Sequence, residues 1–166
     1  MAERVYFGLG SNLGDRLRNL DEALDKLSQN CRVLRHSQVY ETAPWGFDDQ
    51  PAFLNQIAEA ECDLPPLDLL KRIKNLETTL GRTPTFRYGP RLIDIDILIY
   101  GQRILNVPEL TIPHAMISER AFVLVPLAEL IPAETLPGTN KTIAELLAAV
   151  DTHGVKIFEA GKEAAA

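Results

Sequence analysis

The chain has 166 residues, of which 46% are hydrophobic and 24% are charged, values typical of one globular domain with its own core. Its net charge of −6 argues against a general nucleic-acid partner, which would require a basic surface. It contains no apolar run of the ~20 residues needed to span a bilayer and no signal-peptide pattern, so we expect a cytoplasmic protein without a membrane partner. Cys31 and Cys62 form no CxxC pattern and are expected to be free thiols.

The predicted elements alternate between strands and helices. In chain order they are a strand at 5–9 ending in a turn at 10–12, a helix from Asp15, a strand at 33–40, a long loop at 41–51, a strand at 53–62, a helix after Pro65 that Gly81 ends, a loop at 82–90 and a strand at 92–100. The second helix should present one apolar face, formed by Leu67, Leu70, Ile73, Leu76 and Leu80.

The order β-α-β-β-α-β is that of a ferredoxin-like α+β domain. Such a domain packs its helices on one face of an antiparallel sheet and leaves the other face partly open. Short helices are predicted at 118–124 and 142–150, the latter because Thr142 and Glu145 have the spacing of a capping box. We therefore expect a single domain over 1–160 and a flexible tail over 161–166.

Two aspartates interrupt the apolar strand at 92–100. Side chains alternate along a strand, so Asp94 and Asp96 should point to the same face, about 6.6 Å apart along the chain. Mg²⁺ accepts one or two carboxylates and completes its shell with water and phosphate oxygens, and two such ions ~3.5–4 Å apart can clamp a phosphoryl displacement. The alternative is that both aspartates face solvent on an edge strand.

An arginine-rich loop leads directly into this strand. Residues 81–91 contain Arg82, Arg87 and Arg91 and no acidic residue, although the protein as a whole is acidic. Guanidinium groups match phosphate oxygens in a bidentate manner, so the loop beside the aspartates indicates a polyphosphate site. A solvated loop without a ligand is the alternative interpretation.

Weaker signals lie on the other strands. Phe53 and Asn55 should project from one strand face, where an aromatic ring beside an amide suits a flat heterocycle, although a phenylalanine on a strand is more often a core residue. His114 is a lone histidine, and such a residue more often forms structural hydrogen bonds than acts as a catalyst. The GxG at 8–10 resembles the start of a dinucleotide motif, but Leu13 stands where that motif needs glycine.

Several motifs in order resemble those of the 6-hydroxymethyl-7,8-dihydropterin pyrophosphokinase family. The most specific is RYGPRLIDIDIL at 87–98, with GLGSNLG at 8–14 and QPAFLN at 50–55 in support. Further matching positions are Tyr40, Thr42, Gly81, Arg82, Pro113, His114, Arg120 and Phe122. The resemblance covers nearly the whole chain and implies a ferredoxin-like core.

The resemblance also implies a function and roles for residues. The family transfers diphosphate from ATP to the hydroxymethyl group of 6-hydroxymethyl-7,8-dihydropterin and releases AMP, in folate biosynthesis. By resemblance, Asp94 and Asp96 bind two Mg²⁺ ions and Arg82 and Arg91 contact the triphosphate, these four forming the catalytic group. The ATP site also includes Glu77, His114 and Arg120. The pterin pocket comprises Thr42, Phe53, Asn55 and Phe122.

The sequence departs from well-known family members at positions near the expected ATP contacts. These are Thr83, Pro84, Thr85, Tyr88, Glu109 and Ala115, and Phe53 lacks the hydroxyl of a tyrosine found in some members. We expect a monomer, and no histidine or lysine is clearly placed as a general base. The enzymatic alternative is a metal-dependent nucleotidyl transferase, which releases diphosphate. The non-catalytic alternative is a ligand-binding regulatory module.

Overall fold

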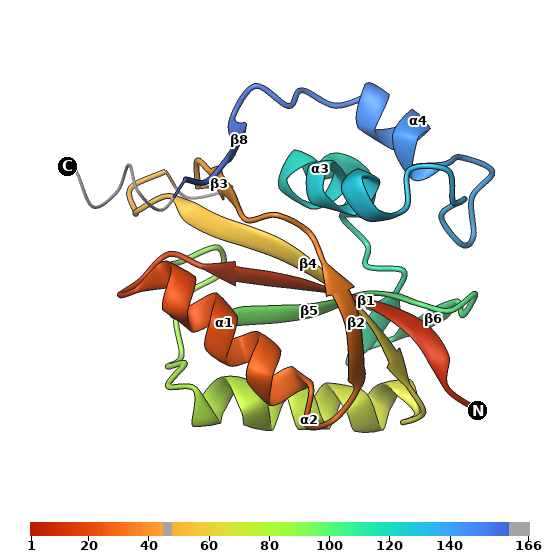
Figure 1. Cartoon of the computed structure of the whole chain (residues 1–166), viewed down its shortest axis with the longest axis horizontal. Coiled ribbons are helices and arrows are strands. Elements are labelled where there is room, and N and C mark those ends of the chain that lie inside the picture. The colour runs from red at the N-terminus through yellow and green to blue at the C-terminus, as the bar shows by residue number, and fades with distance from the viewer. Residues whose placement is uncertain (45–47, 160–166) are drawn as a thin grey trace.

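The computed structural model describes residues 1–44 and 48–159 and shows an α+β domain with antiparallel strand pairs (Figure 1). Its strands are β1 (Glu3–Ser11), β2 (Arg32–His36), β3 (Tyr40–Thr42), β4 (Phe53–Cys62), β5 (Asp94–Tyr100), β6 (Leu105–Val107), β7 (Leu110–Ile112) and β8 (Val155–Ile157). Its helices are α1 (Arg16–Leu27), α2 (Pro66–Thr79), the 3₁₀ turn η1 (Ile117–Glu119), α3 (Ala121–Leu130) and α4 (Ile143–Ala148). The predicted ferredoxin-like α+β fold is confirmed.

The register of β1 with its two neighbours, β4 and the edge strand β5, fixes where functional side chains lie. The sheet has the order β5-β1-β4-β3-β8, with β2 also paired to β4. Gly10 of β1 pairs with Asn55 of β4 and with Asp94 of β5, while Gly8 pairs with Asp96. Residues directly opposite one another across strands point to the same face. The amide and both carboxylates therefore surround a glycine strip on one face of the sheet.

The two faces of the sheet are covered differently (Figure 1). On one face α1 and α2 pack against the sheet in a cluster that buries Phe7, Leu20 and Ile95. On the other, α3 and α4 form a second cluster that includes Leu124 and Ile143. The rest of this second face is lined by Gly8, Gly10 and their neighbours and is hollowed into a pocket. The predicted partly open face is confirmed, and it carries the site.

The segment predicted as one strand over 33–40 forms two short strands instead. Between β2 and β3, Ser37 N donates to Ile57 O at 2.8 Å and Ile57 N donates to Ser37 Oγ at 2.9 Å. A hydroxyl thus replaces one backbone partner, which interrupts the regular ladder. The turn predicted at 10–12 was also wrong at its start, because Gly10 and Ser11 still pair with β4. β5 begins at Asp94 rather than at residue 92.

Other differences concern faces and short elements. Leu67, predicted on the buried face of α2, is 40% exposed. The buried stripe instead runs through Pro66, Leu69, Ile73 and Leu76 at helical spacing, which leaves Leu67 to one side. The helix predicted at 118–124 is a 3₁₀ turn followed by α3, which extends to Leu130. The capping box of α4 is present as predicted, with Thr142 Oγ1 accepting from Glu145 N at 3.1 Å. The short strands β6, β7 and β8 were not predicted.

Two predictions from composition can be compared with the structure. Cys31 and Cys62 are buried free thiols, as expected. Within residues 1–44 and 48–159, no helix is both long and apolar enough to cross a membrane. The predicted tail at 161–166 and part of the predicted loop at 41–51, residues 45–47, lie outside the described residues.

Candidate active site

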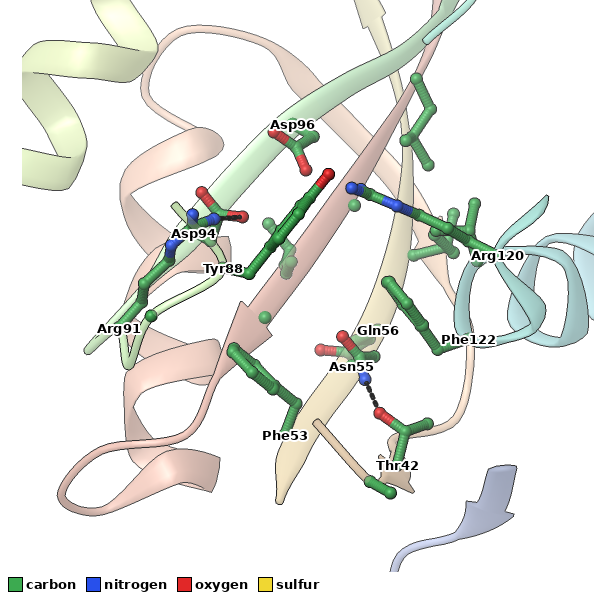
Figure 2. Close-up of a pocket in the computed structure, with 18 residues that line it drawn as sticks. Thr42, Phe53, Asn55, Gln56, Tyr88, Arg91, Asp94, Asp96, Arg120 and Phe122 are labelled. Atoms are coloured by element: carbon green, nitrogen blue, oxygen red, sulfur yellow. Dashed lines mark hydrogen bonds and ion pairs between the residues drawn. The ribbon is translucent and has the colours of Figure 1, made fainter. Parts of the chain in front are cut away.

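One pocket gathers most of the predicted site residues on the open face of the sheet (Figure 2). It contains about 700 Å³ of non-protein space, part of it open solvent. Eight of its lining residues were predicted from sequence: Thr42, Phe53, Asn55, Arg91, Asp94, Asp96, Arg120 and Phe122. The pocket lining does not include Glu77, Arg82 or His114, which lie beside or beneath it.

The two glycines of β1 form the floor of the pocket. A Cβ atom on Gly10 would lie 3.3 Å from Asn55 Oδ1 and 3.8 Å from the ring of Phe53. A Cβ atom on Gly8 would meet Leu98 at 3.4 Å. A side chain at Gly10 would occupy the space in front of Asn55, and one at Gly8 would press against Leu98. The two glycines of the GxG pattern thus keep the floor of the pocket flat, which is a different role from that of the glycines in a dinucleotide motif.

The side of the pocket next to β3 has the chemistry of a site for a flat heterocycle. Asn55 Nδ2 donates to Thr42 Oγ1 at 2.7 Å, which fixes the amide and leaves Oδ1 facing the floor as an acceptor. Phe53 and Phe122 lie on opposite sides of Asn55 and point into the pocket (Figure 2). Two rings beside a fixed amide can hold an aromatic bicycle by its faces and its polar edge.

A cluster of ion pairs forms the opposite side of the pocket. Asp94 Oδ1 lies 3.1 Å from Arg82 Nη1, and Asp94 Oδ2 lies 3.0 Å from Arg91 Nη1. The Nε of Arg91 is buried and has no hydrogen-bond partner in the described part of the chain. A buried donor of this kind at a pocket wall indicates an anionic or polar ligand.

Glu77 supports this cluster from beneath the sheet. Its side chain is 2% exposed and lies on α2, where Oε2 is 2.6 Å from Arg82 Nη1 and Oε1 is 3.2 Å from Lys74 Nζ. Glu77 Oε2 also accepts a hydrogen bond from Ile95 N at 2.9 Å. The carboxylate therefore connects the arginine loop to the aspartate strand. This connection was not predicted from the sequence.

Asp96 is the second aspartate that lines the pocket. Burial and the adjacent Asp94 charge raise the pKa of Asp96 to about 7, although Arg120 opposes the shift. Figure 2 shows the Arg120 guanidinium pointing toward Asp96 from the start of α3. A carboxylate destabilised in this way is a strong candidate for binding a cation.

Removing this destabilised charge should stabilise the ligand-free protein. The folded pKa of Asp96 lies above the unfolded value, so its contribution favours folding near pH 4 and is lost as the pH rises through about 7. Asp96→Asn should therefore raise the free energy of unfolding by about 2–4 kcal/mol at pH 8 and change it little at pH 4. Denaturant unfolding without divalent cations measures this difference. The exposed Asp21 on α1 gives the control variant Asp21→Asn, and an equal gain at both pH values would contradict the assignment.

His114 has a local structural partner. Its Nδ1 accepts a hydrogen bond from Met116 N at 3.2 Å, and its own N donates to Leu98 O at 2.8 Å. Burial, followed by the Arg120 charge, lowers the pKa of His114, so the imidazole is neutral at physiological pH. These contacts fix the ring beside β5, which is compatible with either interpretation of this residue.

Tyr88 extends from the arginine loop into the pocket. Its φ of 60° lies in the left-handed region, which costs energy for a residue with a side chain. The ring points between Asp96 and Arg120 (Figure 2), and the hydroxyl accepts from Arg87 Nη2 at 2.9 Å. Strained backbone of this kind is common at functional sites. The position was noted from sequence only as a departure from the family pattern.

Asn12 joins the two loops that border the pocket. It is 1% exposed; its Nδ2 donates to Gln50 Oε1 at 2.8 Å and its Oδ1 accepts from Arg91 N at 2.7 Å. Gln50 Nε2 in turn donates to Tyr88 O at 2.7 Å. The sequence signal was the asparagine in the GSN turn, but no role was predicted for it.

Comparisons with known proteins agree with this arrangement. The sequence model described as 7,8-dihydro-6-hydroxymethylpterin-pyrophosphokinase (HPPK) matches residues 6–132. The chain is 40% identical over 158 residues to the 2-amino-4-hydroxy-6-hydroxymethyldihydropteridine pyrophosphokinase of Pseudomonas aeruginosa, covering 94% of this chain and 97% of that protein. It is 47% identical over 130 residues to the mitochondrial folate synthesis bifunctional protein of Pisum sativum, covering 78% of this chain and 25% of that longer protein. Wild-type HPPK-DHPS of Plasmodium falciparum, solved with pteroate, has a TM-score of 0.73 at 17% identity, covering 89% of this chain and 42% of that chain, which shows a shared fold.

Proposed function

Since the chain belongs to the 7,8-dihydro-6-hydroxymethylpterin-pyrophosphokinase family, we propose that it transfers diphosphate from ATP to the hydroxymethyl group of 6-hydroxymethyl-7,8-dihydropterin and releases AMP. The observation that carries this proposal is the division of one pocket into two chemically different sides. Phe53, Asn55 and Phe122 suit a pterin, and Arg91 beside the two aspartates suits a polyphosphate.

The pterin side can both bind and select its ligand. The pterin faces are apolar and would stack between Phe53 and Phe122, while Asn55 and Thr42 would pair with polar edge atoms. A heterocycle without those edge atoms would leave the fixed amide unpaired, which costs more than the loss of apolar contact. Selectivity should therefore arise mainly at Asn55.

The phosphate side fits a magnesium–nucleotide complex. The described residues contain no group of three or more His, Cys, Asp or Glu side chains that could hold a metal by themselves. Two carboxylates are nevertheless a donor set that Mg²⁺ accepts when phosphates complete its shell, so Asp94 and Asp96 fit that ion. We propose that they hold two Mg²⁺ ions, which when bound would neutralise charge on the triphosphate.

The chain's own residues would stabilise the transfer. Arg82 and Arg91 approach the same wall of the pocket, where they would contact the oxygens whose charge changes as the bond to the leaving AMP breaks. Arg120 reaches the pocket from the start of α3, and neutral His114 lies beside it. We place both in the ATP site, while Glu77 orients Arg82 from below.

The nucleotide product tests the reaction. Incubation with Mg²⁺, ATP and the reduced hydroxymethylpterin should give AMP and a pterin diphosphate in equal amounts. Chromatography of the nucleotides distinguishes this result from a nucleotidyl transfer, which would release inorganic diphosphate. Binding without any turnover would instead indicate a regulatory module. Light scattering of the same sample tests the proposed monomer.

Phe122→Ala should weaken pterin binding selectively. The ring contributes stacking on the pterin face, worth about 0.5–1.5 kcal/mol beyond its buried area, and truncation also removes that area. We expect pterin affinity to fall by about tenfold or more and ATP affinity to stay within about twofold. Calorimetry with each ligand gives both constants, and Phe86→Ala, an exposed ring on the arginine loop, is the control. Equal losses for both ligands would refute the division of the pocket.

A further inference from the structure

Arg82 and Arg91 form ion pairs with Asp94, the carboxylate that the proposed metal site requires. Each oxygen of Asp94 is within 3.1 Å of a guanidinium nitrogen, Oδ1 from Arg82 and Oδ2 from Arg91. The three side chains are partly buried, at 19% exposure for Asp94 and 22% for each arginine, so the pairs are shielded from competing water. A cation can take both oxygens of Asp94 only after these contacts break.

Arg82 has a second anchor that does not involve Asp94. Glu77 Oε2 is 2.6 Å from the same Arg82 nitrogen, and Glu77 is fixed by the backbone N–H of Ile95. If Arg82 moved away, this buried carboxylate would lose its shorter ion pair and keep only the one with Lys74 at 3.2 Å among the described residues, which is costly. Arg82 can therefore lose Asp94 and still remain at the pocket wall.

Arg91 is anchored through its main chain. Arg91 N donates to Asn12 Oδ1 at 2.7 Å, and Asn12 N donates to Arg91 O at 3.0 Å. These bonds fix the backbone but leave the side chain, whose Nε has no partner among the described residues, held only through its pair with Asp94. The guanidinium can turn away from Asp94 without moving the strand.

We infer that Arg82 and Arg91 neutralise Asp94 in the free protein, where a divalent cation would otherwise do so. When a divalent cation binds Asp94, the two guanidinium groups leave this carboxylate and contact phosphate oxygens of the nucleotide instead. The inference rests on the proposed function. A cation alone must displace guanidinium groups that gain no new partner, so it should bind weakly. A cation with a nucleoside triphosphate provides those partners. The two ligands should therefore strengthen each other's binding reciprocally.

Manganese binding to the free protein tests the exchange. Mn²⁺ is followed by electron paramagnetic resonance or calorimetry, with and without a nonhydrolysable α,β-methylene ATP analogue. Arg91→Gln removes the charge and keeps a shorter polar side chain, and Arg82→Ala removes the second partner. Arg87→Ala is the matched control, because it removes one positive charge from the same loop while its contacts are to Tyr88. Thermal melting verifies the fold of each variant.

Without nucleotide, Arg91→Gln and Arg82→Ala should bind Mn²⁺ about fivefold or more tightly than the unmodified protein, and Arg87→Ala should not. The analogue should strengthen Mn²⁺ binding more in the unmodified protein than in Arg91→Gln. Unchanged nucleotide-free affinity in the two variants, or an equal increase in Arg87→Ala, would overturn the exchange while leaving the metal site intact. Absence of Mn²⁺ binding to the unmodified protein even with the analogue would instead show that the proposed metal site is wrong.

Discussion

Asp94→Asn and Asp96→Asn should each reduce turnover by about a hundredfold or more while the protein remains folded. Each change keeps the size of the side chain and removes one negative charge from the wall of the pocket where the proposed cations would bind. Loss of one preorganised electrostatic contact in a transition state typically has an effect of this size. Steady-state rates at saturating Mg²⁺, with AMP as the measured product, give the result.

The two variants differ in what else they disturb. Asp94 pairs with Arg82 and Arg91, so Asp94→Asn also removes an ion-pair partner from each of these two arginines. Asp96 has no ion pair within residues 1–44 and 48–159, so Asp96→Asn is the cleaner experiment and should not lower the melting temperature. The exposed Asp21→Asn serves as the control for both. Near-normal rates in Asp94→Asn and Asp96→Asn would exclude a catalytic role for the carboxylates.

Arg91→Ala should lower kcat by about a hundredfold and change pterin affinity little. The guanidinium lies on the phosphate side of the pocket, on the opposite side from Asn55 (Figure 2). Its contribution should be largest when negative charge redistributes during transfer, so the loss appears in the rate more than in the binding of either ligand.

Single-turnover rates combined with calorimetry separate these effects. Arg91→Lys tests the fork geometry, because lysine restores the charge but cannot make two parallel hydrogen bonds, and we expect partial recovery. Arg87→Ala should retain most of the rate of transfer. If Arg91→Ala reduced pterin affinity as strongly as kcat, the assignment of this residue to the phosphate side would be wrong.

The positions of many site residues could be predicted from local sequence patterns, which do not depend on contacts between distant segments. Alternation along a strand placed Asp94 and Asp96 on one face, and it placed Phe53 beside Asn55 in the same way. The excess of arginines in the loop before β5 correctly predicted that Arg91 lies at the pocket. Helix boundaries were accurate where a cap or a proline defines them, at Thr142 and Pro66.

The features that sequence reasoning missed depend on contacts between distant segments. Asn12 joins two loops that are far from it in the chain, and the burial of Glu77 depends on how α2 lies against β5. The strand over 33–40 was divided by a hydroxyl of Ser37 that bonds to β4. The three-residue strand β8 has too few residues for periodicity to be recognised.

The position of β8 has a consequence for how the protein is made. β3, which carries Thr42, lies between β4 and β8, and Tyr40 pairs with Ile157 from near the end of the described chain. During synthesis the outer edge of β3 therefore stays without its partner until the residues of β8 have left the ribosome. Such long-range pairing forms late and slowly, and an open strand edge can pair with other chains in the meantime. The proposed pterin side of the pocket should thus mature only after β8 has been made, and the open edge of β3 needs protection from aggregation until then.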